Sequence, residues 1–110
     1  SIMAQLYTKV KLYLEANSKN WNDEQNNIRL QNDTGTDYIH TWNVSGLAKP
    51  TDDQLATYES SATTEENNVV IKRTRKSAYG DIGDQLDEIY KDIDAWKARI
   101  KSIKDANPKE

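Results

Sequence analysis

The chain has 110 residues, with 15 Lys plus Arg against 18 Asp plus Glu, a net charge of −3 and no Cys. This length suits one small domain or a domain with an appendage, and the lack of Cys excludes a disulfide framework, a thiolate nucleophile and a Cys-based zinc site. Only 35% of the residues are apolar and 30% are charged. We therefore expect a small core whose stability depends on a partner or on self-association.

Two classes of partner are not expected. The apolar stretches are only a few residues long, which predicts neither a membrane span nor the apolar region of a signal peptide. The slight excess of acidic residues argues against bulk binding of nucleic acid, because phosphate binding needs a basic face. The expected chain is therefore soluble and binds neither membranes nor nucleic acid.

The N-terminal third is predicted to contain an amphipathic helix over residues 2–16, followed by a polar loop over residues 17–23. The helix is predicted because apolar side chains recur every three or four residues. The residues that carry this pattern are Ile2, Met3, Leu6, Val10, Tyr13 and Leu14. The loop is predicted because short amide and hydroxyl side chains compete for backbone hydrogen bonds.

Residues 27–31 and 38–43 are predicted to form a β-hairpin. Both segments are rich in β-favouring side chains, and the intervening cluster around Asp33 and Gly35 is typical of a turn. The pattern leaves the inward face of the second strand open. That face presents either Tyr38, His40 and Trp42, or Ile39 and Thr41.

The middle of the chain is predicted to be helical. Thr51 and Gln54 have the spacing of a capping box, so a helix should start at Thr51 and run to about Glu59. A second capping-box pattern over residues 63–66 predicts another helix start. The triplet at residues 69–71 is β-branched and favours a strand, but helix is the preferred prediction.

The last third contains seven apolar residues at alternating spacings of four and three, which is a heptad pattern. The members of this seam are Ile82, Leu86, Ile89, Ile93, Trp96, Ile100 and Ile103. The pattern predicts a helix of about 22 residues, roughly 33 Å long, that is closed by Asn107 and Pro108. Because isoleucine occupies both core positions of the heptad, association should favour a trimer over a dimer.

Several residue groups are of types that can carry chemistry. His40 is the only His, and it has no orienting partner in the sequence, so a structural or surface role is preferred. The segment at residues 33–37 could hold a hard cation, but a plain turn is preferred because further acidic ligands are missing. Gly80 and Gly83 resemble a phosphate loop only superficially, and a helix-breaking turn is preferred.

Two further groups have surface interpretations. The basic residues Lys72, Arg73, Arg75 and Lys76 have no interleaved aromatic residues, so a solvated or salt-bridged face is preferred over nucleic-acid binding. Of the three Trp residues, Trp42 is expected in the core, and Trp96 is a candidate interface anchor.

The order of residues at 28–58 resembles the XkdW-like family of small phage and prophage tail-cluster proteins. Residues that carry this resemblance are Ile28, Gly35, Trp42, Pro50 and Leu55 among others. The stretch from Arg75 to Lys109 is similar to the C-terminal signature of short tail-fibre-associated or tail-assembly proteins of tailed phages. This chain has Gly80 where that group commonly has Pro. Members often carry an insertion between the regions of Leu86 and Trp96, which implies a helical hairpin in place of one rod.

The resemblance implies a virion or assembly role and no catalytic residues. The resulting prediction is an α+β protein with a body at residues 1–60, a helical connecting segment at 61–80 and a C-terminal helical or coiled-coil segment at 81–110. Its expected function is that of a structural component of the tail-fibre or baseplate region, located in the virion and, during assembly, in the host cytoplasm. Other tail proteins and further copies of the chain, forming a trimer through the seam, are its expected partners.

Two alternatives remain open. The first is an assembly chaperone that is absent from the mature virion. The second is a nucleic-acid-binding regulator that uses residues 72–76. No enzyme activity, cofactor or metal is expected.

Overall fold

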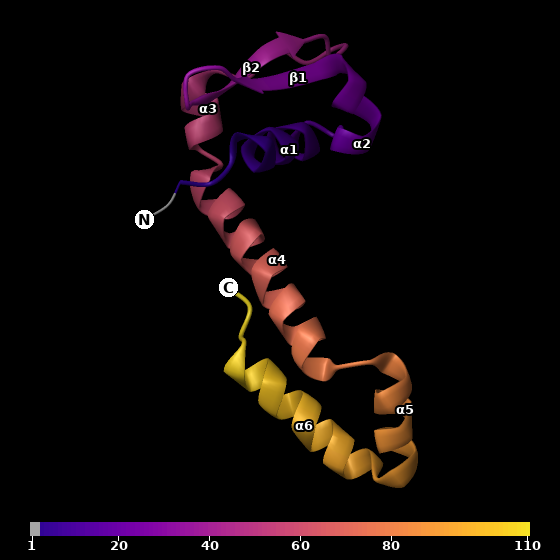
Figure 1. The fold of residues 1–110 in the computed structure, drawn as a ribbon. Helices are drawn as coiled ribbons and strands as arrows, with labels where there is room; N and C mark the ends of the chain where they lie inside the picture. Colours follow the sequence, from indigo (N-terminus) through magenta and orange to yellow (C-terminus); the bar gives the residue numbers. More distant parts are fainter. Residues whose placement is uncertain (1–2) are drawn as a thin grey trace. The chain divides into compact units, whose positions relative to one another are not determined.

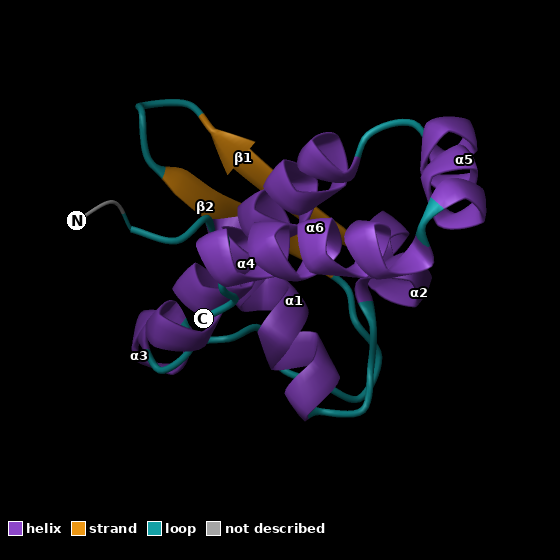
Figure 2. Cartoon of the chain, turned by 90° about the horizontal axis from the view of Figure 1, so that it is seen from below, coloured by secondary structure: helices purple, strands orange, loops and turns teal. Residues whose placement is uncertain are grey.

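The computed structural model describes residues 3–110 and has the expected α+β class: an N-terminal helix, a two-stranded antiparallel hairpin, a short helix and long C-terminal helices (Figure 1). Figure 2 distinguishes the two strands, in orange, from the helices, in purple. The chain divides into two compact units, residues 1–65 and residues 66–110. The boundary falls within one helix, and each unit is described by itself below.

The first helix, α1 (Leu6–Ala16), confirms the predicted N-terminal helix with a later start. Ile2 lies outside the described residues, and Met3 is exposed ahead of the helix. The apolar periodicity puts Val10 and Leu14 on the inner face, where both are fully buried.

A short helix, α2 (Trp21–Glu24), and a single 3₁₀ turn, η1 (Gln25–Asn27), occupy a segment that was predicted in part to be a loop. The prediction was wrong from Trp21 onward. The side chain of Asn20 accepts a hydrogen bond of 2.9 Å from the backbone N–H of Asp23, so it caps α2. An Asn side chain competes for backbone hydrogen bonds inside a helix, but at the N-cap position the same ability stabilises the start of a helix.

The hairpin of β1 (Ile28–Asn32) and β2 (Asp37–Trp42) confirms the prediction, and its register contains a β-bulge. Leu30 pairs with Ile39 while Arg29 pairs with Thr41, so His40 is the extra residue of β2. An extra residue reverses the alternation of side chains along a strand. The bulge therefore allows both Ile39 and Trp42 to reach the core, although they belong to opposite predicted faces.

The core of the first unit lies between α1, the hairpin and the segment that follows it. Its buried members are Val10, Leu14, Ile28, Ile39, Val44 and Leu55. Two aromatic side chains fix the loop after β2, because Tyr13 donates a hydrogen bond of 2.8 Å to the carbonyl of Ala48 and the indole of Trp42 donates one of 2.8 Å to that of Leu47. These bonds satisfy the polar ends of rings whose bodies pack against the core.

The helix α3 (Asp52–Ala56) starts as predicted. Thr51 Oγ1 accepts from the backbone N–H of Gln54 at 3.1 Å, and the Gln54 side chain accepts from the N–H of Thr51 at 2.9 Å, which completes the capping box. The helix ends earlier than the predicted Glu59, and Glu59 instead begins the next helix.

That next helix, α4 (Glu59–Tyr79), is continuous through the predicted second start, which was therefore wrong. A capping box needs a non-helical first residue, whereas Thr63 lies inside α4 next to Ala62, which is fully buried. The preferred helical state of residues 69–71 is confirmed.

The single rod predicted from the seam was also wrong, because two helices, α5 (Ile82–Lys91) and α6 (Ile93–Ala106), replace it. The alternative of two helices is confirmed. Asp92 is extended, with φ −161° and ψ 93°, and its carboxylate accepts from the N–H of Ala95 at 3.1 Å. An aspartate that caps a new helix thus interrupts the heptad pattern. Gly80, at φ +85°, forms the turn before α5, and α6 ends at Ala106 as predicted.

Candidate interaction surface

The second unit contains no apolar core. Of its residues, which are all described, only Gln85 is buried, while every buried apolar side chain lies in the first unit. A helical unit of this size ordinarily depends on burial of an apolar face, because isolated helices are marginal in water. In a single chain this unit therefore has only half-buried apolar side chains and polar contacts between its helices to hold it together.

Arg99 of α6 supplies the largest set of these contacts. Its guanidinium donates to both carboxylate oxygens of Glu88 on α5, at 2.8 and 2.6 Å. It also donates to the carbonyls of Ala78 at 3.1 Å and Tyr79 at 2.9 Å, which lie in the last turn of α4. One planar side chain thus joins three helices and satisfies carbonyls that have no partner within their own helix.

A second arginine makes the reciprocal contact between α4 and the end of α6. Arg75 donates from Nε to the carbonyl of Asn107 at 2.8 Å and from Nη2 to that of Lys104 at 3.4 Å. Beyond α6, the backbone N–H of Glu110 donates to Asn68 at 2.8 Å. The C-terminal residues therefore lie along α4 and are held there by hydrogen bonds.

The seam residues are divided between two environments. Ile82, Leu86 and Ile93 are 71%, 59% and 46% exposed. The others are half-buried within the second unit: Ile89, Trp96, Ile100 and Ile103. The indole N–H of Trp96 donates to Gln85 at 3.3 Å, so this ring is directed toward α5. The structure thus leaves only part of the predicted interface open to a partner.

Three exposed apolar residues of this unit are not members of the predicted interface. Tyr90 is 93% exposed, and Val69 and Val70 on α4 are 50% and 53% exposed. Tyr90 stands four residues after Leu86, so a helical period of four would have identified it, whereas the strict heptad did not. Val69 and Val70 belong to the β-branched triplet at residues 69–71, whose sequence signal concerns helix or strand and not exposure.

Charge is distributed unevenly around these exposed side chains. Residues 67–80 contain four basic residues and no acidic residue, whereas residues 81–94 contain six acidic residues and one Lys. Lys72, Arg73 and Lys76 are exposed, and among the described residues none of them has a side-chain hydrogen bond or ion pair. The predicted solvated basic face is therefore present, except that Arg75 turns inward.

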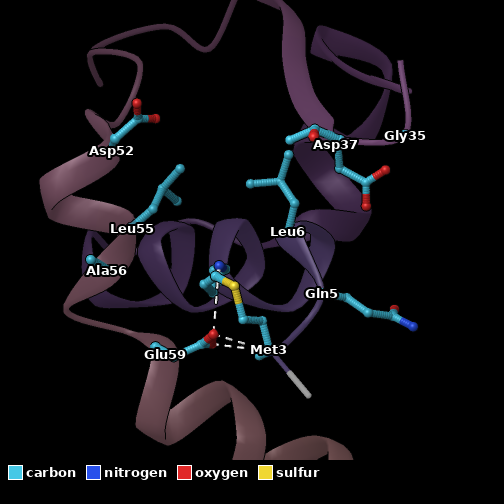
Figure 3. A pocket seen from close by; sticks show the side chains of 12 residues that line it. Met3, Gln5, Leu6, Gly35, Asp37, Asp52, Leu55, Ala56 and Glu59 are labelled. Carbon is cyan, nitrogen blue, oxygen red and sulfur yellow. Dashed lines mark hydrogen bonds and ion pairs between the residues drawn. The ribbon is translucent and has the colours of Figure 1, made fainter. Parts of the chain in front are cut away.

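The first unit carries a cleft of about 640 Å³ between the start of α1, the turn of the hairpin and α3 (Figure 3). Met3, Leu6 and Leu55 supply apolar walls, and Asp37, Asp52 and Glu59 supply carboxylates. Figure 3 shows Glu59 turned toward the N-terminal segment, and both of its carboxylate oxygens accept from the N–H of Ala4 at 3.1 Å.

Most of the polar groups of this cleft have partners within the chain. Lys9 Nζ lies 4.0 Å from Glu59, and Asp37 accepts from the amide of Asn32 at 2.7 Å. The lining contains no His and no Cys. The cleft therefore combines apolar walls with carboxylates, of which Asp37 and Glu59 are already hydrogen-bonded within the chain.

The polar side chains of the hairpin turn form hydrogen bonds within the turn. Gly35, at φ +89°, donates its N–H to the Asn32 side chain at 2.9 Å, and Gln31 donates to both oxygens of Asp33 at 2.9 Å. His40 is exposed and lies 2.8 Å from its neighbour Thr41. Among the described residues no group of three or more His, Asp or Glu is placed to hold a metal ion.

Replacing Tyr38 by phenylalanine should raise the pKa of Asp33 toward its ordinary value. The hydrogen bond from the Tyr38 hydroxyl, followed by the one from Gln31, lowers the pKa of Asp33. Because the folded pKa lies below the unfolded one, this stabilisation is present above the unfolded pKa and is lost as the pH falls through the folded pKa. NMR titration of the Asp33 carboxyl carbon measures the change.

The matched control is Tyr90→Phe, which removes the hydroxyl of a ring that is 93% exposed. An Asp33 titration that is the same in the wild type and in Tyr38→Phe would show that the Tyr38 hydrogen bond has no influence in solution.

Comparisons of the chain with protein families, with characterised proteins and with solved structures found no match. None of the helices in residues 3–110 has the length and apolar content needed to cross a membrane. The fold and the surface thus define a class: a small α+β protein whose helical C-terminal unit exposes apolar side chains.

Proposed function

We propose that this chain is a structural component of a tailed-phage virion, in the tail-fibre or baseplate region, and that it acts by protein–protein assembly. The observation that carries an assembly role is the second unit, which buries no apolar side chain while Ile82, Leu86 and Ile93 remain exposed. Apolar side chains gathered on one helical unit are typical of an interaction surface. Placement in a phage tail is supported by the resemblance of residues 28–58 and 75–109 to tail-cluster proteins.

The proposed partners are further copies of the chain and other tail proteins. Burial of an exposed Ile or Leu side chain contributes about 1.5–3 kcal/mol. Association through these residues would therefore supply the apolar burial that the second unit lacks as a single chain. The proposed oligomer is the trimer that the isoleucine-rich heptad spacing predicts, although that rule is made for a continuous coiled coil and the break at Asp92 limits it to the exposed seam residues of α5 and the start of α6.

Quantitative mass spectrometry of purified mature particles tests this function. A reproducible copy number relative to known tail proteins is expected, and a multiple of three would support the trimer. Presence in the lysate together with absence from particles would overturn the structural role in favour of an assembly chaperone. That chaperone would contact the same surface and leave before maturation.

The double substitution Leu86→Glu with Ile93→Glu should abolish self-association. Each change puts a charge where the proposed interface buries an apolar group, and an unpaired buried charge is strongly unfavourable. Sedimentation velocity should show the wild type as an oligomer and the variant as a monomer, with equal helical content by circular dichroism.

The control for this pair is Lys91→Glu with Lys97→Glu, which introduces the same two glutamates, by charge reversal, at exposed residues of the same two helices. An unchanged mass of the Leu86 and Ile93 variant, with its helices retained, would remove these residues from the interface.

A further inference from the structure

The exposed apolar side chains of the second unit form two separate groups. On α5, Ile82, Leu86 and Tyr90 recur every four residues, so they form one stripe along the helix. On α4, Val69 and Val70 lie on the side opposite Arg75, which faces α6. We call these groups the α5 stripe and the α4 face.

The two groups have opposite electrostatic surroundings. The α4 face includes Arg73 and Lys76, because these residues follow Val69 by four and seven positions. The α5 stripe is flanked by Asp87, and Asp94 follows shortly after the end of α5. All four charged side chains are exposed, and none has an ion-pair partner among the described residues.

We propose that the α5 stripe of one copy packs against the α4 face of a second copy. Two nearby glutamates do not compete for these charges. Glu66, three residues before Val69, already has an interaction within the chain, and Glu88 accepts from Arg99. The α4 face thus offers apolar groups with unpaired basic side chains, and the α5 stripe offers apolar groups in mainly acidic surroundings, with Lys91 beside Tyr90 as the one basic neighbour. If two α5 stripes packed against each other, the aspartates of one copy would face the same aspartates of the other, which is unfavourable. If the α5 stripe packs against the α4 face, Asp87 and Asp94 instead face Arg73 and Lys76.

An interface between two different surfaces has a consequence for symmetry. When copies are joined head to tail, the copy at one end keeps a free α5 stripe and the copy at the other end keeps a free α4 face. The assembly therefore either closes into a ring or grows into a filament. A rotation of one third of a turn per copy closes it at three copies. The inference rests on the proposed assembly function and specifies how copies of the chain meet.

Two charge-reversed variants test the pairing. Arg73→Glu with Lys76→Glu makes both surfaces acidic, and Asp87→Lys with Asp94→Lys makes both basic. Each variant alone should self-associate at least about tenfold more weakly than the wild type, because like charges then face each other. An equimolar mixture should associate again, since each acidic surface meets a basic one wherever the two variants alternate. A ring of three cannot alternate throughout, so pairs or even-numbered assemblies are expected in the mixture in place of the trimer.

Sedimentation velocity at low salt, with circular dichroism to verify folding, measures all three samples. Lys97→Glu with Lys104→Glu reproduces the charge change of the acidic variant on α6, outside both the α4 face and the α5 stripe, and should keep wild-type association. The proposal is overturned if the mixture stays monomeric, if either variant alone associates like the wild type, or if the wild type is itself monomeric.

These outcomes are separate from the test of the proposed function. A chain that is counted in mature particles and yet fails the mixing experiment would keep its structural role and lose this head-to-tail interface. A chain that passes the mixing experiment and is missing from particles would keep the interface and lose the structural role.

Discussion

Replacement of Leu14 by alanine is expected to lower the free energy of unfolding of the first unit by about 2–5 kcal/mol. Leu14 is fully buried at the centre of the core between α1 and the hairpin. Removing its isobutyl group loses apolar burial and leaves a cavity that the surrounding side chains fill only in part. Because so small a unit has little stability in reserve, this one change could unfold much of it.

Urea denaturation followed by NMR of the indole N–H groups measures the effect, since Trp42 reports on the first unit and Trp96 on the second. The matched control is Met3→Ala, which removes apolar atoms from a side chain of the same unit that is 74% exposed. Equal losses of stability in the two variants would contradict the assignment of Leu14 to the core.

Replacement of Arg99 by methionine is expected to destabilise the second unit by about 1–2 kcal/mol. A hydrogen bond to a charged group contributes roughly 1.5–3 kcal/mol when buried. That range is reduced here because the Arg99 and Glu88 side chains are 35% and 39% exposed. Since Arg99 joins α4, α5 and α6, its loss should open all three helices in amide hydrogen exchange.

Two further variants, Arg99→Lys and Lys101→Met, are compared with Arg99→Met. Arg99→Lys should recover little, because a single ammonium group cannot reach a carboxylate and two carbonyls as a guanidinium does. Lys101→Met removes an exposed ion pair with Asp105 on the same helix and should change stability by less than about 0.5 kcal/mol. If Lys101→Met and Arg99→Met open the helices equally, Arg99 is not the contact that holds the unit together.

The second unit has no fully buried apolar side chain, which makes its stability sensitive to a partner that would bury its exposed ones. Its helices are joined by the hydrogen bonds of Arg75 and Arg99 and by apolar side chains that are only half-buried. Polar contacts of this kind are directional but weakly stabilising at a protein surface. A partner that buries the exposed apolar residues would add most to the stability of a unit built in this way.

Local features of the chain were predictable from sequence because neighbouring residues determine them. The capping box at Thr51 starts α3, the glycine-containing turn around Gly35 joins two strands, and Asn107 follows the last residue of α6. In each case a side chain or a permitted backbone angle satisfies groups within a few positions. The apolar period of α1 likewise identified Val10 and Leu14 as core residues.

The heptad seam was interpreted less successfully because two local signals compete at Asp92. Seven apolar residues in register indicate one helix, while an aspartate at position 92 with Asp94 in the first turn after it indicates a helix start. The folded chain follows the capping signal, and Arg99 stabilises the result by joining α6 to α5 and α4. Apolar spacing says which residues can share a face, but it does not say whether the helix between them is continuous.

By itself, the sequence determined the α+β class, the hairpin, the capped start of α3 and the small apolar content that points to association. Only the tertiary structure decided that the bulge at His40 turns both Ile39 and Trp42 inward, and which seam residues stay exposed. The physical reason is range: caps and turns are satisfied by neighbours in the chain, whereas strand register and exposure depend on residues far apart in sequence.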